Sequence, residues 1–255
     1  MSRGSARIRI GGTLAAAGFR RTRILRSGCA KCAKILRRSN KMAQLDLEDP
    51  KSFVLIPEHK LKITRSIATN AMSFEKTNWV LNKKGLWMPS PAPFMSHYHR
   101  TYKAACGKET LYDGEHNPIS KNEAQDIWEE ISGQKKPISL WLNARFLSND
   151  IIESDYRKSG SLSDAKYTRR PRQNMLENCF VDFDSLDRNG FPFNLSKFQN
   201  YRREENIYLG NFIKGSVVWF DAGSNWAYLE GINDETCSYS SLAIWPEEKI
   251  FGDKA

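Results

Sequence analysis

The spacing of apolar residues along the chain predicts one clear amphipathic helix, over residues 120–131. Four apolar side chains in this segment recur at i, i+3, i+4 and i+7, which places them on one face of a helix. They are Ala124, Ile127, Trp128 and Ile131. Ser120 and Glu123 have the three-residue spacing of a capping box at the start of the helix, and Gly133 provides a stop.

Short clusters of β-branched and aromatic residues predict strands on both sides of this helix. The cluster over residues 52–66 is interrupted by Pro57 and predicts one or two strands, and residues 137–147 predict a longer one. Two further clusters, VVWF and LAIW, lie within 216–220 and 241–245. Short mixed strands with one or two helices and long ordered loops indicate the α+β class.

Two other segments are predicted to lack regular structure. Three prolines within five residues remove backbone donors from residues 77–102, so an extended coil is predicted there and a helix is not. These prolines are Pro89, Pro91 and Pro93. Residues 153–174 are polar, basic and rich in serine, which predicts a long surface loop.

The segment between the two C-terminal strand clusters has the composition of a binding loop. About twenty residues of Gly, Ser, Asn, Asp, Tyr and Trp separate VVWF from LAIW, without a regular period. Tyr and Trp provide contact area at a low entropic cost, while Ser, Gly and Asn provide adaptable hydrogen bonds. Composition alone leaves an ordinary long connection between two strands as the alternative.

Basic residues are concentrated at the N-terminus. The net charge of the 255-residue chain is +10, and residues 1–45 contain nine Arg, three Lys and no acidic residue. The remaining 27 basic residues are balanced by 29 acidic ones, so residues 46–255 carry a charge near −2. We therefore predict a basic leader, residues 1–45, that is disordered or not part of the fold, followed by a single globular domain over residues 46–255.

Three interpretations of the leader stay open. Its Arg, Ser and Ala content is typical of an organelle transit peptide, translation can instead begin at Met42, or the segment is a basic arm that touches nucleic acid or membrane. We expect a cytoplasmic protein, or an organelle-targeted one if residues 1–41 are a transit peptide. No run of about 18 apolar residues occurs, so no membrane span is predicted.

Few residues indicate catalysis or metal binding. In an extended segment His97 and His99 point the same way and can begin a metal site, and Cys106 with a histidine can form a nucleophile–base pair. The sequence offers neither further ligands at a suitable spacing nor a strand–turn–helix context for the thiol. We therefore predict no catalytic residue, no metal site and no cofactor, with an enzyme that uses Cys106 or the His97–His99 pair as the alternative.

Nucleotide and nucleic-acid signatures are absent from the sequence outside the leader. Neither G-x-G-x-x-G nor G-x-x-x-x-G-K-[ST] occurs. Residues Tyr167–Arg172 combine basic and aromatic side chains, but the surrounding domain carries no net positive charge. Cys29 and Cys32 form a C-x-x-C pair without the second pair that a zinc site needs. A nucleic-acid partner is therefore predicted only through the leader.

The C-terminal segment contains a longer pattern, S-V-x-x-F-x-A-x-S-x-x-A-x-L, followed by a polar interval and S-x-x-S-L. Its residues are Ser216, Val217, Phe220, Ala222, Ser224, Ala227, Leu229, Ser238, Ser241 and Leu242. This tail resembles that of the variable proteins of diversity-generating retroelements, although Ala243 and Trp245 stand where those proteins have Gly and Arg. The resemblance covers residues 75–250, and its specific part is the tail.

The resemblance implies a C-type-lectin-like fold related to formylglycine-generating enzymes, with a ligand-binding region near residues 216–246. It also implies contact residues that can change without unfolding the scaffold. The paired catalytic cysteines of those enzymes have no counterpart here, which implies a non-enzymatic protein that displays its tail to a protein or other macromolecule. The implied contact residues are Asp221, Gly223, Asn225, Trp226, Tyr228, Glu230, Asn233, Asp234 and Tyr239.

Overall fold

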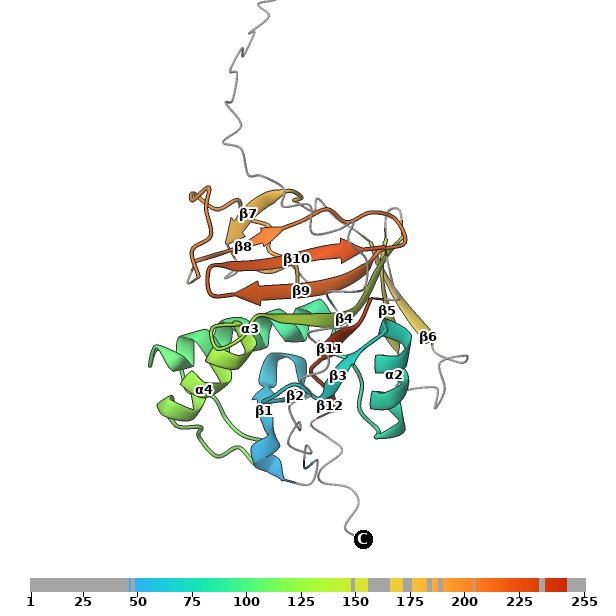
Figure 1. Ribbon diagram of the computed structural model, residues 1–255. Coiled ribbons are helices and arrows are strands. Elements are labelled where there is room, and N and C mark those ends of the chain that lie inside the picture. Colours follow the sequence, from blue (N-terminus) through green and yellow to red (C-terminus); the bar gives the residue numbers. More distant parts are fainter. Residues whose placement is uncertain are drawn as a thin grey trace, which may run out of the picture. The chain divides into compact units, whose positions relative to one another are not determined.

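The strand clusters of the sequence form two sheets in the computed structural model of the chain (Figure 1). The structure describes residues 46, 49–147, 150–155, 166–171, 176–182, 185–187, 190–203, 205–233 and 237–246. The chain divides into residues 1–43 and 44–255, and every described residue belongs to the second unit. That unit is of the α+β class, as predicted, while the predicted leader lies outside the described residues.

The smaller sheet is antiparallel and has the strand order β1–β2–β12. Its strands are β1 (Phe53–Ile56), β2 (Leu61–Thr64) and β12 (Ile244–Pro246), and β1 follows the 3-10 turn η1 (Pro50–Ser52). A second 3-10 turn, η2 (Pro57–His59), separates β1 from β2. The predicted interruption at Pro57 is therefore confirmed, because proline fixes φ and cannot donate to a strand ladder.

The larger sheet has nine strands in the described part of the chain. Its main path is β3–β11–β4–β9–β10–β8–β7, with β5 paired to β4 and β6 paired to β5. The bounds are β3 (Thr69–Met72), β4 (Ile138–Leu147), β5 (Asp150–Asp155), β6 (Lys166–Pro171), β7 (Cys179–Asp182), β8 (Asn206–Leu209), β9 (Val217–Gly223), β10 (Trp226–Ile232) and β11 (Tyr239–Ser241). The β11–β4 and β10–β8 pairs are parallel and the others are antiparallel.

The hairpin of β5 and β6 corrects the prediction of a single long loop over residues 153–174. Strand β5 continues to Asp155, and β6 begins at Lys166 and pairs with it along its whole length. The polar and basic sequence of residues 153–174 has no apolar alternation, so it gives no local signal for strands. Residues 156–165 and 172–175 lie outside the described residues.

Three α-helices occur among the described residues, where one or two were predicted. They are α2 (Phe74–Lys83), α3 (Pro91–Ala105) and α4 (Lys121–Ile131). Ser73 caps the start of α2, and Gly85 follows its end with a left-handed φ of 70°.

Helices α2 and α3 contradict the prediction of an extended coil over residues 77–102, since α2 covers 77–83 and α3 begins at Pro91. Pro91 is the first residue of α3 and Pro93 lies in its first turn. Backbone N–H groups in the first turn have no acceptor within the helix, so prolines there sacrifice no hydrogen bond, and their fixed φ already suits a helix. Only Pro89 lies before the helix and in extended coil.

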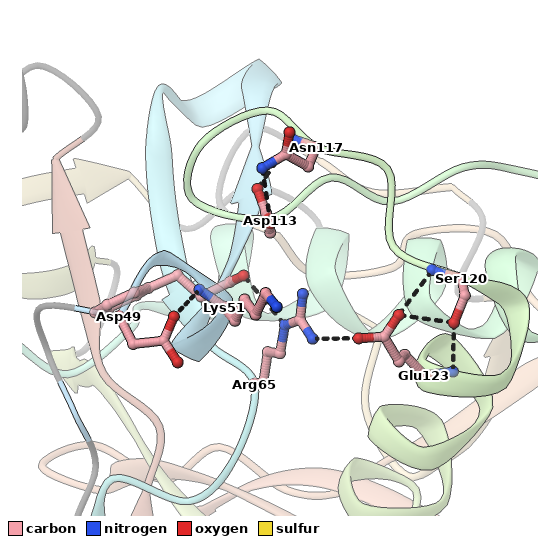
Figure 2. Close-up of polar contacts among 8 residues, drawn as sticks. Asp49, Lys51, Arg65, Asp113, Asn117, Ser120 and Glu123 are labelled. Carbon is pink, nitrogen blue, oxygen red and sulfur yellow. Dashed lines mark hydrogen bonds and ion pairs between the residues drawn. The ribbon is translucent and has the colours of Figure 1, made fainter.

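The predicted capping box at the start of α4 is confirmed. The Ser120 hydroxyl accepts a hydrogen bond from the Glu123 backbone N–H at 3.3 Å, and the Glu123 carboxylate accepts one from the Ser120 backbone N–H at 3.1 Å. Figure 2 shows that the same carboxylate also reaches Arg65, which follows β2, at 3.2 Å. The cap therefore satisfies the helix terminus and ties α4 to the smaller sheet.

Replacing Ser120 with alanine is expected to lower the free energy of unfolding by about 1 kcal/mol, because the Glu123 N–H loses its acceptor. Urea denaturation monitored by circular dichroism measures the change. Threonine at the same position keeps a hydroxyl acceptor and serves as the control, with an expected loss well below that of alanine. Equal stability of the alanine variant and the original protein would contradict a stabilising cap.

The larger sheet carries helices on both faces. On one face, the Phe220 ring of β9 lies 4.8 Å from the Phe94 ring of α3. On the opposite face, the Phe74 ring of α2 lies 5.7 Å from the Trp141 ring of β4. Helix α2 lies beside β3 and β11, at one end of the sheet (Figure 1). On this second face, Phe180 of β7, Tyr208 of β8 and Tyr228 of β10 remain only half-buried.

Candidate functional site

The part of the polar, aromatic segment up to Ile232 belongs to a β-hairpin and not to the long loop that its composition predicted. Strands β9 and β10 pair antiparallel from Gly223 and Trp226 outwards, so only Ser224 and Asn225 lie between the closing pair. On each strand, apolar residues at alternate positions face α3. These buried residues include Val218, Phe220, Ala222, Ala227 and Leu229. Phe220, Ala222, Ala227 and Leu229 of the tail pattern therefore belong to the core.

The alternate residues form a row across five strands. Ser139 of β4 pairs with Asp221 of β9, and Asp221 pairs with Tyr228 of β10. Tyr228 in turn pairs with Tyr208 of β8, and Tyr208 with Phe180 of β7. Directly paired residues project from the same side of a sheet, so these five side chains lie on one face, opposite α3 and α4.

A second set of side chains lies next to this row on the same face. Trp219 of β9 pairs with Glu230 of β10, two positions along from the first row, and Trp226 lies two positions from Tyr228. We call the half-buried set the open face. Its members are Phe180, Tyr208, Trp219, Asp221, Trp226, Tyr228 and Glu230. The Trp219 end adjoins a second hydrophobic cluster, the α2 cluster, which includes Phe74 and Leu81 of α2 and Trp141 of β4. There the Tyr239 ring stacks on the Trp219 ring at a centroid distance of 5.0 Å.

Asp221 occupies the centre of the open face. Its carboxylate accepts hydrogen bonds from the Ser139 hydroxyl at 2.7 Å and from the Trp226 indole N–H at 3.3 Å. Burial nevertheless raises the pKa of Asp221 above its usual value, and the two hydrogen bonds only partly oppose this shift. The side chain is therefore held in place while its charge remains poorly solvated.

Glu230 is the second carboxyl group of the open face. Its side chain lies against the backbone of Gly210, where an added Cβ would meet the Glu230 Oε2 atom at 2.2 Å. Burial raises the pKa of Glu230, and the negative charge of Asp221 raises it further, whereas the Trp219 indole acts in the opposite direction. The pKa of Tyr228 is also raised, first by burial and then by Asp221, Tyr208 and Glu230. These groups therefore form one electrostatically coupled site.

Replacing Glu230 with glutamine is expected to stabilise the folded protein at neutral pH. A carboxyl group whose pKa is higher in the folded than in the unfolded state makes stability fall as the pH rises through the interval between the two values. The advantage of the glutamine variant in melting temperature should therefore be present at about pH 7 and small at about pH 3.5, below the unfolded carboxyl pKa. Glu205→Gln, at an exposed position, is the control. An equal advantage at both pH values would show that burial of the charge is not the cause.

Gly223 does not belong among the exposed contact residues that were predicted. It is buried, and an added Cβ would lie 2.5 Å from the Trp226 ring. Gly223 therefore leaves the space in which the Trp226 indole packs, and it cannot accept varied side chains. The prediction treated it as exposed because sequence alternation does not report which neighbour lies over a glycine.

The structure brings together only some of the other predicted contact residues. Asp221, Trp226, Tyr228 and Glu230 lie on the open face. Asn225 and Asn233 are both exposed, but they lie at opposite ends of β10, roughly 26 Å apart along an extended strand. Tyr239 packs between Trp219 and Trp141 at the border with the α2 cluster, and Asp234 lies outside the described residues.

Three members of the open face were absent from the sequence prediction. Phe180 and Tyr208 come from strands distant in the sequence, and Trp219 lies within the strand cluster VVWF, at a position to which no role was assigned. The local signal was present in NIYL, where Tyr208 stands between the buried Ile207 and Leu209. Strand order and register, which place these residues beside Tyr228, are not encoded in such local patterns.

The alternative catalytic positions do not form the arrangement expected from the sequence. His97 and His99 lie two residues apart on α3, so their side chains point in different directions. His97 is buried, and burial followed by the charge of Arg100 lowers its pKa to about 3. Cys106 is exposed at the end of α3, and no hydrogen bond within the described ranges joins its thiol to a histidine.

Comparisons with known proteins give no family assignment. No family model, no curated protein and no solved structure matches this chain. Among the residues that the structure describes, no three His, Cys, Asp or Glu side chains gather as a metal ion would require. No helix in the described ranges combines the length and apolar character needed to cross a bilayer.

Proposed function

We propose that the domain is a non-enzymatic binding protein whose open face contacts a macromolecular partner. The observation that carries the proposal is the row of Asp221, Tyr228, Tyr208 and Phe180, which crosses four neighbouring strands. Aromatic side chains dominate the energetics of protein interfaces, and a rigid sheet presents them at fixed positions. The row is half-buried, so a partner gains apolar contact area without first ordering a loop.

The two sides of the β9–β10 hairpin differ in burial, which supports the proposal that the contact residues on its open side can be replaced. Phe220 and Leu229 pack into the core, whereas Tyr228 and Glu230 project from the opposite side of the same strands. Substitutions on one side of a sheet can therefore alter the contact surface without removing core volume. The resemblance to retroelement variable proteins, and with it a C-type-lectin-like fold, belongs to the same proposal.

A pair of display libraries tests the binding function. The first library varies Asn225, Tyr228 and Glu230, and the second varies Phe220, Ala227 and Leu229 of the same hairpin. Lysozyme serves as an unrelated target for selection. The first library should retain folded clones and yield binders with dissociation constants in the micromolar range or below, about −8 kcal/mol or better. The second should lose most folded clones, because each member removes or overfills buried volume.

Two results would overturn the proposal. Equal loss of folded clones in both libraries would mean that the open face is part of the folding core. A well-folded first library that yields no binder would mean that the face does not support recognition. In a selected binder, alanine at Trp226 should weaken binding by about 2 kcal/mol or more, as expected of a tryptophan that dominates an interface.

The flanking DNA tests the retroelement part of the proposal separately. A near-copy of the 3′ coding region should lie close to a reverse-transcriptase gene and should differ from the coding copy at template adenines. The differing codons should be those of open-face and turn residues such as Asn225, Tyr228 and Glu230. Absence of such a copy removes the retroelement interpretation and leaves the binding function to the library experiment.

A further inference from the structure

The two carboxyl groups of the open face have no cationic partner among the described residues. Within the described part of the chain, neither Asp221 nor Glu230 forms an ion pair with a Lys or Arg, and no cation contributes to their pKa shifts. Glu109, whose side chain is 29% exposed, has the Arg100 guanidinium at 2.6 Å. Glu109 thus has a cation at its carboxylate that Asp221 and Glu230 lack within the described residues.

The open face favours a cation from outside the domain. Two like charges in a partly desolvated position repel each other, and an added positive charge offsets both the repulsion and the lost hydration. The negative faces of aromatic rings attract cations as well. Tyr208 and Tyr228, at a ring distance of 5.6 Å, lie next to the carboxylates on the same face.

The combination of carboxylates and aromatic rings favours a guanidinium over an ammonium group. A guanidinium is planar, stacks on aromatic rings, donates two parallel hydrogen bonds to one carboxylate and is more weakly hydrated than the lysine ammonium. A divalent metal ion would need further oxygen ligands, and no third carboxylate or histidine joins the pair within the described residues.

We infer that the partner of the open face presents an arginine side chain, whose guanidinium pairs with Asp221 and Glu230 beside the rings of Tyr208 and Tyr228. This inference rests on the proposed binding function and specifies the chemistry of the partner. Charge complementarity supports this occupant, because the face holds two carboxylates and its described neighbours supply no neutralising cation.

Titration of the full chain with small probes tests the inference. The probes are acetyl-arginine amide, acetyl-lysine amide and acetyl-citrulline amide, and the last has the shape of arginine without its charge. NMR signals of the Trp219 and Trp226 indole N–H groups report binding, and a Trp226→Phe variant assigns them. The arginine probe should saturate these signals. The affinity for the citrulline probe should be lower by a factor of about ten or more, because the charge-assisted hydrogen bonds are lost.

Two variants locate the contact. Glu230→Gln keeps the size of the side chain and should weaken arginine binding about tenfold, whereas Glu205→Gln, at an exposed position, should leave it unchanged. Circular dichroism confirms that both variants are folded. Equal arginine affinity of the original chain and Glu230→Gln would overturn the inference, as would equal affinity for arginine and citrulline.

Two further probes separate this inference from the binding function on which it rests. Saturation of the same indole signals by methyl glucoside or by calcium ions, with no response to arginine, would overturn the arginine partner and leave a binding face of another chemistry. No response to any probe, together with successful selection of lysozyme binders, would also overturn the arginine partner alone. Failure of both experiments would remove the binding function as well.

Discussion

Alanine at Phe220 is expected to lower the free energy of unfolding by about 3–5 kcal/mol, the usual cost of removing a large buried aromatic side chain. Phe220 is fully buried in the middle of β9. Its ring lies 4.8 Å from that of Phe94 and 5.2 Å from that of Tyr98, both on α3. The substitution therefore opens a cavity between the larger sheet and the helix that covers it, where neither element can collapse to fill the space.

The same hairpin supplies a matched control for Phe220. Tyr228 is also aromatic and lies on the neighbouring strand, but it projects from the open face and is half-buried. Tyr228→Ala should cost about 1 kcal/mol or less, because its loss leaves a solvent-accessible gap and not a closed cavity. Urea denaturation of both variants measures the difference. Comparable losses at the two positions would mean that both sides of the hairpin are core, and the binding proposal would fail.

Alanine at Trp128 is expected to have an effect of similar size, about 3–5 kcal/mol. Only 3% of this side chain is exposed. Its ring contacts Tyr98 and Tyr102 of α3, with centroid distances of 4.9 and 5.2 Å. Trp128 is thus the main aromatic contact between α3 and α4, and its removal should loosen both helices from the sheet.

Trp79 of α2 is the control for Trp128, since it is a tryptophan on a helix with the opposite environment. It is 46% exposed, and the Lys83 ammonium lies 3.6 Å from its ring centroid. An exposed cation–π pair contributes about 0.5–1 kcal/mol, so Trp79→Ala should cost no more than about 1 kcal/mol. Thermal denaturation of the two variants decides the point. If Trp128→Ala left the stability nearly unchanged, a different side of α4 would have to pack against the rest of the domain.

The open face also has a thermodynamic consequence for the whole domain. Asp221 and Glu230 retain raised pKa values in the folded state, so their ionisation at neutral pH opposes folding. Binding sites often retain such unfavourable groups because a partner relieves them. A substitution that stabilises the free domain, such as Glu230→Gln, is therefore expected to weaken binding at the same time.

The sequence by itself determined the features that depend on neighbours along the chain. Helix α4 was predicted with its apolar face and its capping box, because residues three and four apart share one side of a helix. The division of the tail into fixed residues such as Phe220 and Leu229 and contact residues such as Tyr228 was implied by the resemblance, and the period of two in a strand explains why the two sets lie on opposite sides. Composition and charge also show that basic residues are concentrated in residues 1–45, and the leader predicted from them stays a prediction.

Only the tertiary structure decided the features that depend on contacts across the fold. Pro91 and Pro93 permit helix α3 because they occupy its first turn, a position that proline content alone does not specify. Gly223 is buried because the Trp226 ring lies over it. Phe180 and Tyr208 join Tyr228 through strand pairing between distant segments. Strand order, register and covering side chains arise from long-range packing, and local hydrophobic patterns carry no information about them.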